Sequence, residues 1–309
     1  MKKTAFLFAG QGAQSQGMGR ELYDRYALVR EAYQEASSIL GYDIRRLIDE
    51  DKDKLNQTRY TQPAILTTSV AIYRLLQENG LSPDLVAGLS LGEYSALVAS
   101  GALGFEEALK LVAKRGELME AAAPLGSGKM VAIMNADTSL IERACHQASD
   151  LGIVSPANYN TPSQIVIGGE VAAVDRALGL LQEAGVKRMI PLQVSGPFHT
   201  ALLEPASLGL AEVLDGIAFD DFKVPLIGNT EARVMSKKAI KSLLARQVME
   251  PVRFYESIAN MQEMGVERIV EVGPGKVLSG FVKKIDKALP AFPINDQASL
   301  MALLNQEVE

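Results

Sequence analysis

Ser90 lies in a segment, residues 88–92, that reads Gly-Leu-Ser-Leu-Gly and matches the G-x-S-x-G pattern of a nucleophilic serine. The largely apolar residues 84–89 predict a buried strand before the serine, and residues 91–100 predict a helix after it. Such a turn leaves no room for Cβ atoms at the glycines, and it presents the hydroxyl at a helix N-terminus beside free backbone N–H groups. The pattern therefore predicts nucleophilic catalysis by Ser90; a structural turn is the alternative.

A serine nucleophile needs a base, and the chain has two histidines, His146 and His199. His146 lies inside a predicted surface helix beside Cys145. Neighbours at i and i+1 on a helix do not face each other, so these two form a poor nucleophile–base pair. His199 follows Gly-Pro-Phe at residues 196–198, in a loop between a hinge and a helical stretch, where functional residues are common. We predict that His199 is the base; a solvated loop histidine is the alternative.

The group that orients the histidine is not evident from the residues. Four acidic residues follow His199 without any distinctive spacing: Asp215, Asp220, Asp221 and Glu250. A backbone or amide carbonyl is equally able to hold the ring, because orienting an imidazole does not require a charge. Both kinds of partner therefore stay open.

A second glycine-rich loop, residues 10–14, follows the predicted strand 4–9 and reads Gly-Gln-Gly-Ala-Gln. It is not a dinucleotide fingerprint, because the third glycine comes only at position 17, and it is not a phosphate loop, because no Gly-Lys-Ser/Thr is present. A serine nucleophile of this kind takes one oxyanion donor from the following residue and another from a separate glycine-rich loop. We predict the N–H groups of Leu91 and Gln11 in these roles; for Gln11, a simple tight turn is the alternative.

Arg115 breaks the pattern of its predicted helix, residues 105–122. It stands on the apolar stripe, three residues after Val112 and seven after Ala108. A guanidinium that points inward is costly unless it meets an anion, and its planar fork suits a carboxylate. We predict that Arg115 receives a substrate carboxylate; the alternatives are a side chain that reaches the surface and an internal ion pair.

The elements that must position these residues alternate between strands and helices, including predicted helices at 19–40 and 64–78, which implies a mainly parallel sheet covered on both faces. The middle of the chain instead has the order β-α-β-β-α-β, typical of a ferredoxin-like unit. Its expected elements are 129–134, 138–150, 153–158, 164–168, 171–185 and 188–192. We therefore predict an α/β fold with a large catalytic domain, residues 1–125 and 197–309, and an inserted ferredoxin-like domain, residues 126–196.

The composition of the chain limits the kinds of partner and cofactor that we expect. The 309 residues carry 31 basic and 37 acidic side chains, a net charge of −6, which disfavours nucleic acid as the main partner. One cysteine excludes an internal disulfide framework, and with two histidines the chain is poor in metal ligands, so no metal or cofactor is expected. The apolar start is too short for a secretory signal, and Glu93 interrupts the apolar residues 85–104, so we expect a cytoplasmic protein without membrane contact.

Several motifs in one order give the chain a specific likeness along nearly its whole length. The chain resembles the malonyl-coenzyme A:acyl-carrier-protein transacylases, the discrete acyltransferases of bacterial fatty-acid synthesis. The matching segments are residues 10–14, 88–93, 114–116, 155–162, 197–199, 246–247 and 271–276. The resemblance implies a hydrolase-like α/β domain with an inserted ferredoxin-like domain, and transfer of a malonyl group from malonyl-coenzyme A to acyl carrier protein through a malonyl-serine.

The resemblance also implies roles for single residues. It makes Ser90 the nucleophile and His199 the base, and it assigns the oxyanion to the N–H groups of Gln11 and Leu91. Arg115 would bind the malonyl carboxylate.

The resemblance covers positions that the residues alone do not explain. Gln247 matches the position whose carbonyl orients the histidine, and Lys187 and Arg188 match a basic pair associated with the phosphorylated substrate arm. Phe198 resembles the malonyl-selective form of related acyltransferases, because its bulk would crowd an α-methyl group. One departure is Leu89, where the family often has histidine.

Two other functions share parts of this pattern. A thioesterase or esterase has the same serine and base but hands the acyl group to water, and an inactive acyl-coenzyme A sensor would bind without turnover. Acidic carrier proteins would also need a basic docking face on this acidic chain. Candidates are Lys187, Arg188, Lys237, Lys238 and Lys241.

Overall fold

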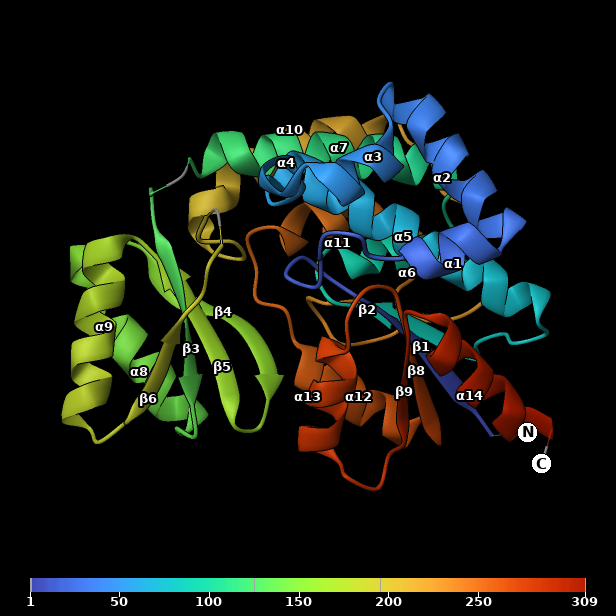
Figure 1. Ribbon diagram of the computed structural model, residues 1–309. Helices are drawn as coiled ribbons and strands as arrows, with labels where there is room; N and C mark the ends of the chain where they lie inside the picture. The colour runs from blue at the N-terminus through green and yellow to red at the C-terminus, as the bar shows by residue number, and fades with distance from the viewer. Residues whose placement is uncertain (1, 125, 195, 309) are drawn as a thin grey trace.

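The computed structural model describes residues 2–124, 126–194 and 196–308 and contains two separate β-sheets (Figure 1). The larger sheet is parallel throughout, with the strand order β7-β2-β1-β8-β9. Its strands are β1 (Thr4–Phe8), β2 (Leu85–Gly88), β7 (Leu226–Ile227), β8 (Arg268–Val272) and β9 (Ala291–Ile294). Parallel strands need crossover connections, and helices supply them.

The α-helices of the described chain fall into three groups by sequence. The first group is α1 (Arg20–Arg25), α2 (Ala27–Leu40), α3 (Ile44–Glu50), α4 (Lys52–Leu55), α5 (Thr58–Glu78), α6 (Gly92–Ala99) and α7 (Phe105–Ala122). The second is α8 (Thr138–Ala148) and α9 (Val171–Glu183). The third is α10 (Glu204–Asp215), α11 (Ile240–Gln247), α12 (Phe254–Glu263), α13 (Val277–Ile285) and α14 (Gln297–Val308).

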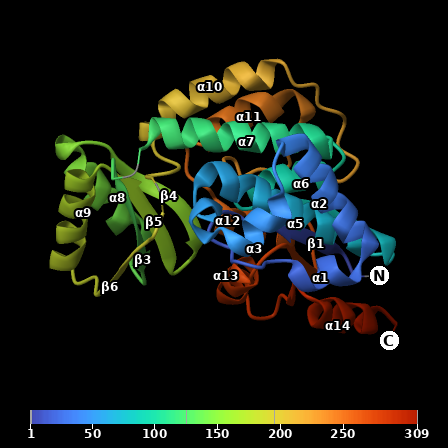
Figure 2. The ribbon, with the colours of Figure 1, turned by 45° about the horizontal axis from the view of Figure 1, so that its top comes forward.

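Alternate residues of β1 face two different cores, as the two-residue period of a strand requires. Phe6 and Phe8 pack with the helices α2, α5, α6 and α7, and Ala5 and Leu7 pack with α12 and α13. Figures 1 and 2 show these helix groups on opposite sides of the large sheet, with both chain ends close together. The predicted sheet covered on both faces is therefore confirmed.

The smaller sheet is antiparallel and has the order β4-β5-β3-β6. Its strands are β3 (Lys129–Met134), β4 (Val154–Thr161), β5 (Gln164–Gly169) and β6 (Arg188–Pro191). Val131 and Ile133 pack against α8 and α9 on the outer face, which leaves the other face toward the larger sheet (Figure 1). This arrangement confirms the predicted α/β fold with an inserted ferredoxin-like unit.

The domain limits themselves stay a prediction. Leu125, where the first segment of the large domain was expected to end, lies outside the described residues, as do Ser195 in the second hinge and the terminal residues Met1 and Glu309. The small sheet is joined to the large unit through β4, which pairs with Val252 in the segment before α12. The Tyr159 N–H donates to the Val252 carbonyl at 2.9 Å, and the Val252 N–H donates to the Ala157 carbonyl at 2.9 Å.

Two helices differ from their predicted limits by more than the one or two residues seen at other helix ends. The expected helix 19–40 is two helices, because Tyr26 is extended (φ −112°, ψ 125°). The Tyr26 hydroxyl donates to Gln297 at 2.6 Å. The helix expected at 64–78 begins at Thr58 and contains Pro63. Pro63 is the sixth residue of this helix and removes one backbone hydrogen bond, and the helix continues through it.

None of the described helices combines the length and apolar character needed to cross a lipid bilayer.

Candidate active site

Ser90 lies in the turn between β2 and α6, with a left-handed backbone (φ 52°) that is unusual for a residue other than glycine. The residues two positions before and after it, Gly88 and Gly92, must be glycine. A Cβ on Gly92 would lie 2.0 Å from the Phe8 carbonyl oxygen, and one on Gly88 would lie 2.0 Å from the Gly92 carbonyl carbon. The turn is held by Asn229, whose Oδ1 accepts from the Ser90 N–H at 2.6 Å. The predicted strained serine turn is therefore present.

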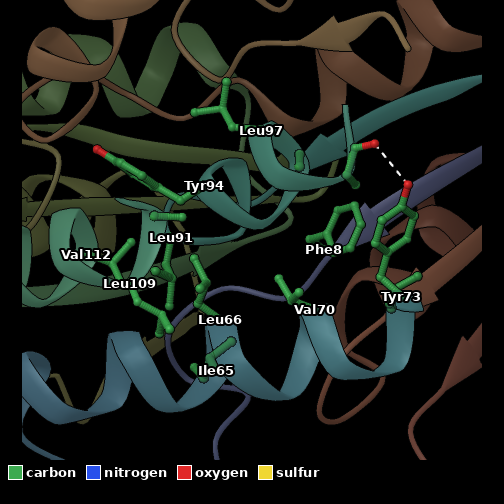
Figure 3. Close-up of a cluster of buried hydrophobic side chains, with 14 of the residues drawn as sticks. Phe8, Ile65, Leu66, Val70, Tyr73, Leu91, Tyr94, Leu97, Leu109 and Val112 are labelled. Atoms are coloured by element: carbon green, nitrogen blue, oxygen red, sulfur yellow. Dashed lines mark hydrogen bonds between the residues drawn. The ribbon is translucent and has the colours of Figure 1, made fainter. Parts of the chain in front are cut away.

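Leu91 anchors this turn in the core. Its side chain is fully buried among Ile65 and Leu66 of α5 and Leu109 and Val112 of α7 (Figure 3). The backbone at Leu91 is therefore fixed beside the nucleophile by packing on two helices.

His199 is brought to Ser90 from a loop 109 residues further along the chain, with a distance of 2.8 Å between its Nε2 and the Ser90 Oγ. Its Nδ1 lies 2.7 Å from the Gln247 backbone oxygen. A carbonyl only accepts, so Nδ1 must carry the proton and Nε2 must be free to accept from the serine hydroxyl. In the described chain no carboxylate hydrogen-bonds to the ring, so a backbone carbonyl stands where many serine enzymes have an acid.

The surroundings of His199 keep it neutral. Its exposed fraction is 4%, and burial, together with the nearby positive charge of Arg115, lowers its pKa to about 4. An imidazole with this pKa is unprotonated at neutral pH and is able to accept a proton. By contrast, His146 is exposed on α8, and its neighbour Cys145 is buried.

Arg115 is a buried cation beside the nucleophile. Its exposed fraction is 1%, and its Nη2 donates to the Ser90 Oγ at 3.1 Å and to the Gln247 Oε1 at 3.0 Å. Within the described residues its Nε has no acceptor and no carboxylate lies within ion-pair distance. The side chain therefore neither reaches the surface nor forms an internal ion pair, and burial lowers its pKa. What the guanidinium lacks is an anion.

The two expected oxyanion donors lie near the serine. Among the described residues, neither the Leu91 N–H nor the Gln11 N–H has a hydrogen-bond acceptor. The Gln11 side chain donates to Thr58 at 3.1 Å. Unpaired N–H groups at such a turn are the donors that an oxyanion requires.

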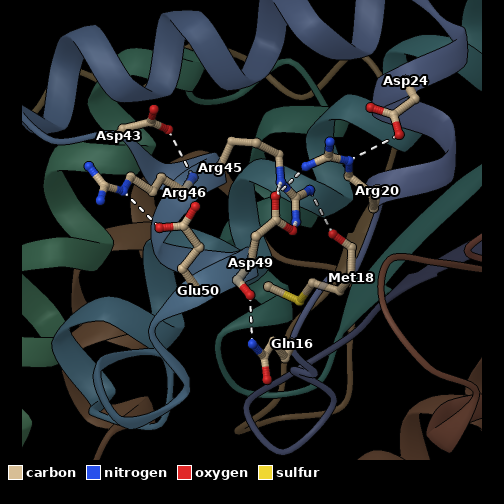
Figure 4. Close-up of polar contacts among 9 residues, drawn as sticks. All are labelled: Gln16, Met18, Arg20, Asp24, Asp43, Arg45, Arg46, Asp49 and Glu50. Atoms are coloured by element: carbon tan, nitrogen blue, oxygen red, sulfur yellow. Dashed lines mark hydrogen bonds and ion pairs between the residues drawn. The ribbon is translucent and has the colours of Figure 1, made fainter.

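The far end of the loop that carries Gln11 is tied to α3 by polar contacts around Asp49 (Figure 4). The Gln16 amide donates to the Asp49 backbone oxygen at 2.6 Å, and Arg20 donates to its carboxylate at 2.7 Å. Arg45, paired with the same carboxylate, donates to the Met18 backbone oxygen at 2.9 Å. These contacts fix the far end of the loop, whose near end, residues 10–13, lines the same cleft as Ser90.

A cleft of about 310 Å³ lies between the two sheets, and the side chains of the candidate site line it. Its lining includes Gln11, Ser90, Arg115, Phe198 and His199 from the large unit, and Met130 and Ala132 from the inner face of the small sheet. Nothing in the described chain gathers three metal-ligating acidic, histidine or cysteine side chains.

The basic candidates are not in the cleft. Lys187 and Arg188 are exposed at the start of β6, the edge strand of the small sheet, and neither lines the cleft. Lys237 pairs with Asp221, and Lys241 donates to the Asp215 backbone oxygen at 3.0 Å. The structure therefore does not bring the lysines and Arg188 together with Ser90, and their roles stay predictions.

Two buried residues of the site were not predicted. Glu93 and Asn229 hydrogen-bond to each other, and Asn229 also donates to the Gly88 backbone oxygen at 2.6 Å. Glu93 had a sequence signal, because an acidic residue in an apolar helix is unusual. Asn229 had none, since its partners lie about 140 residues away.

Comparison with known proteins agrees with this geometry. Residues 5–299 match the family described as acyl transferase domain. A malonyl CoA-acyl carrier protein transacylase of Bacillus subtilis is 46% identical over 303 residues, which cover 97% of this chain and 96% of that protein. The crystal structure of MCAT from Streptococcus pneumoniae has a TM-score of 0.97 and 69% identity and covers 98% of this chain and 100% of that one.

A third relative was solved with a partner. It is described as a type II PKS acyl-carrier protein in complex with its malonyl-transacylase, with a TM-score of 0.96 and 44% identity, and the match covers 98% of this chain and 99% of that one. Identity at this level over nearly the full length of each chain is far beyond a shared fold alone. The chain therefore belongs to the malonyl CoA-acyl carrier protein transacylase family of acyl transferases.

Proposed function

We propose that this enzyme transfers the malonyl group of malonyl-coenzyme A to the phosphopantetheine thiol of acyl carrier protein, for fatty-acid biosynthesis, through a malonyl-serine at Ser90. The names of the relatives support the reaction, and the carrier-protein complex of one relative supports the partner. The observation that carries the proposal is the buried Arg115 guanidinium, which has no ion-pair partner in the described chain and lies 3.1 Å from the nucleophile. A malonyl carboxylate supplies the missing charge.

The first half-reaction acylates the serine. The Ser90 Oγ attacks the thioester carbonyl carbon while the Nε2 of His199 takes the hydroxyl proton. The N–H groups of Gln11 and Leu91 stabilise the negative oxygen of the tetrahedral intermediate. The carbon–sulfur bond then breaks, and the coenzyme A sulfur takes the proton back from His199.

The second half-reaction reverses these roles with a different thiol. The phosphopantetheine thiol of the carrier gives its proton to His199, and its sulfur attacks the ester carbonyl carbon. The bond to Ser90 breaks, and the serine oxygen recovers its proton from the imidazole. Gln247 holds the ring through both steps, because its backbone oxygen accepts from Nδ1 at 2.7 Å.

The remaining expectations fit into this scheme. Phe198 lines the cleft directly before His199 and crowds an α-methyl group, a discrimination of about 1–3 kcal/mol for one methyl. Lys187 and Arg188 are exposed at one edge of the small sheet and are candidates for contact with the phosphorylated arm or the carrier. The reaction needs no bound cofactor in this scheme, and we place the enzyme in the cytoplasm.

Transfer to a thiol, not to water, is the property that separates this function from a thioesterase. We expect intact-protein mass spectrometry of the enzyme with malonyl-coenzyme A to show one malonyl group that persists in buffer. Adding the phosphopantetheine form of acyl carrier protein is expected to clear the adduct and to yield malonyl-carrier. Release of free malonate at one rate with and without the carrier would identify a thioesterase, and binding without any adduct would identify a sensor.

The pH dependence of acylation provides a separate prediction. Because the pKa of His199 is lowered to about 4, the base stays neutral as the pH falls through 6.5, where an ordinary histidine takes up its proton. We expect the single-turnover rate of Ser90 acylation to show no fall from histidine protonation until the pH approaches 4. Rapid-quench measurements across this range test the prediction, and a half-maximal rate near pH 6.5 would contradict it.

A further inference from the structure

Glu93 is a buried acid that the transfer steps do not use. It lies in the first turn of α6, three residues after the nucleophile, with an exposed fraction of 1%. Its Oε2 accepts from the Asn229 N–H at 2.8 Å and from the Gln247 Nε2 at 3.1 Å. In the described chain no cation lies within ion-pair distance of this carboxylate. The partners that hold it are therefore neutral N–H donors.

Both partners of Glu93 also hold the reacting groups. Gln247 accepts from Arg115 through its side-chain Oε1 at 3.0 Å and from His199 through its backbone oxygen at 2.7 Å. Its Nε2 donates to the Ser90 backbone oxygen at 2.9 Å. Asn229 accepts from the Ser90 N–H at 2.6 Å. A single intervening residue, Gln247 or Asn229, thus links the Glu93 Oε2 to the nucleophile, the base and the buried cation.

The chemistry of these groups allows only one orientation of the Gln247 amide. A carboxylate oxygen accepts hydrogen bonds, and a guanidinium only donates them. With Nε2 toward Glu93 and Oε1 toward Arg115, both contacts are favourable. A flipped amide would place Oε1 against the carboxylate and Nε2 against the guanidinium, which are two repulsive contacts in a buried site.

We propose that Glu93 is a positioning residue that fixes the orientation of the Gln247 amide and thereby aligns Arg115 and His199 with Ser90. This inference rests on the proposed malonyl transfer for the role of Arg115, but its effect on the pair Ser90–His199 is independent of the acyl group. The proposed role depends on the position of the Glu93 oxygen that accepts from the Gln247 amide, and not on its charge.

The protonation of Glu93 is compatible with this role. Burial raises its pKa to about 7, against the hydrogen bonds from Asn229 and Gln247 and the charge of Arg115, which lower it. A proton on Oε1 leaves Oε2 as the acceptor of both hydrogen bonds. The acceptor is therefore present in both protonation states.

Two substitutions separate the position of the oxygen from its charge. Glu93→Gln keeps an acceptor oxygen at the same reach and removes the charge, whereas Glu93→Asp keeps the charge and withdraws the oxygen by one methylene. We expect Glu93→Gln to acylate Ser90 within about threefold of the wild-type rate. We expect Glu93→Asp to lose about tenfold or more, because small displacements of catalytic groups have effects of this size. Glu117→Asp, an exposed acid on α7, is the matched control.

The rates are measured per folded molecule with malonyl-coenzyme A, with acetyl-coenzyme A, and with phenylmethylsulfonyl fluoride. This uncharged reagent reports on Ser90 and His199 even if malonyl transfer were wrong. We expect Glu93→Asp to slow all three reactions and to slow malonyl more than acetyl, because Arg115 also loses its fixed partner.

Equal rates in wild type and Glu93→Asp would overturn the proposal, as would a tenfold loss in Glu93→Gln with an unchanged melting temperature. If Glu93→Asp does not fold, Glu93→Met, which has a similar length and no acceptor oxygen, takes its place, and a wild-type rate in that variant would overturn the proposal. A wild-type enzyme that reacts with phenylmethylsulfonyl fluoride but forms no malonyl adduct would instead contradict the proposed function.

Discussion

A Ser90→Ala enzyme is expected to form no malonyl adduct and to lose malonyl transfer by at least about 10⁴-fold, the scale found when the nucleophile of a catalytic serine unit is removed. The alanine deletes the oxygen that lies 2.8 Å from the His199 Nε2 and 3.1 Å from the Arg115 Nη2. No other described hydroxyl is hydrogen-bonded to this imidazole. Stopped transfer assays and intact-protein mass spectrometry measure the two losses.

Ser95→Ala is the matched control for this loss. Ser95 lies on α6, the helix that follows the nucleophile; it is fully buried, and within the described chain its hydroxyl has no hydrogen-bond partner. Its removal is expected to leave adduct formation and transfer at wild-type rates. A Ser90→Ala protein that still carries the malonyl group would show that another residue is the nucleophile.

The parts of the fold that depend on local pattern could be predicted from the sequence. The helix at residues 105–122 and the strand at 129–134 were predicted with the limits that the structure has, because their apolar periods and flanking glycines are unambiguous. The break at Tyr26 could not be predicted. Residues 20–40 contain no glycine or proline that would mark it, and the partner of the Tyr26 hydroxyl, Gln297, lies 271 residues away.

The candidate site divides in the same way. The turn at Ser90 carries its own signal, because two glycines must stand where a Cβ would meet backbone atoms within about 2 Å. The choice of His199 followed from the scarcity of histidines, and its distance to Ser90 agrees with that choice. The partner of its Nδ1 is a backbone oxygen, and a backbone oxygen has no signature in the sequence. Only the family resemblance indicated Gln247.

For Arg115, the helical periodicity of the sequence predicts the direction of the side chain but not its contacts. Its place on an apolar stripe predicted an inward side chain, and the exposed fraction of 1% confirms this. Periodicity does not say what an inward cation meets. The structure adds that it contacts Ser90 and Gln247 and that no described carboxylate lies within ion-pair distance of it.

Replacing Arg115 with methionine is expected to lower kcat/KM for malonyl-coenzyme A by about 10²–10³-fold, since losing one partner of a buried charge pair costs about 2–5 kcal/mol. The acetyl rate is expected to change by less than about tenfold, because an acetyl group has no carboxylate. Arg115→Lys keeps the charge but loses the planar fork, so an intermediate malonyl rate is expected. Paired kinetics with the two thioesters measure the shift in preference.

The same substitution has an opposite expected effect on stability. Arg115 is a desolvated cation without a carboxylate partner in the described chain, and replacing buried charges with apolar side chains is often neutral or stabilising. We expect urea unfolding of Arg115→Met to give a free energy of unfolding equal to or above that of wild type. Lys114→Met, an exposed neighbour on the same helix, controls for the loss of a positive charge. Equal losses of the malonyl and acetyl rates, or a marked fall in the free energy of unfolding, would mean that Arg115 serves the fold and not the substrate carboxylate. A more stable enzyme that has lost only its preference for malonyl would mean that the buried charge is kept for the substrate.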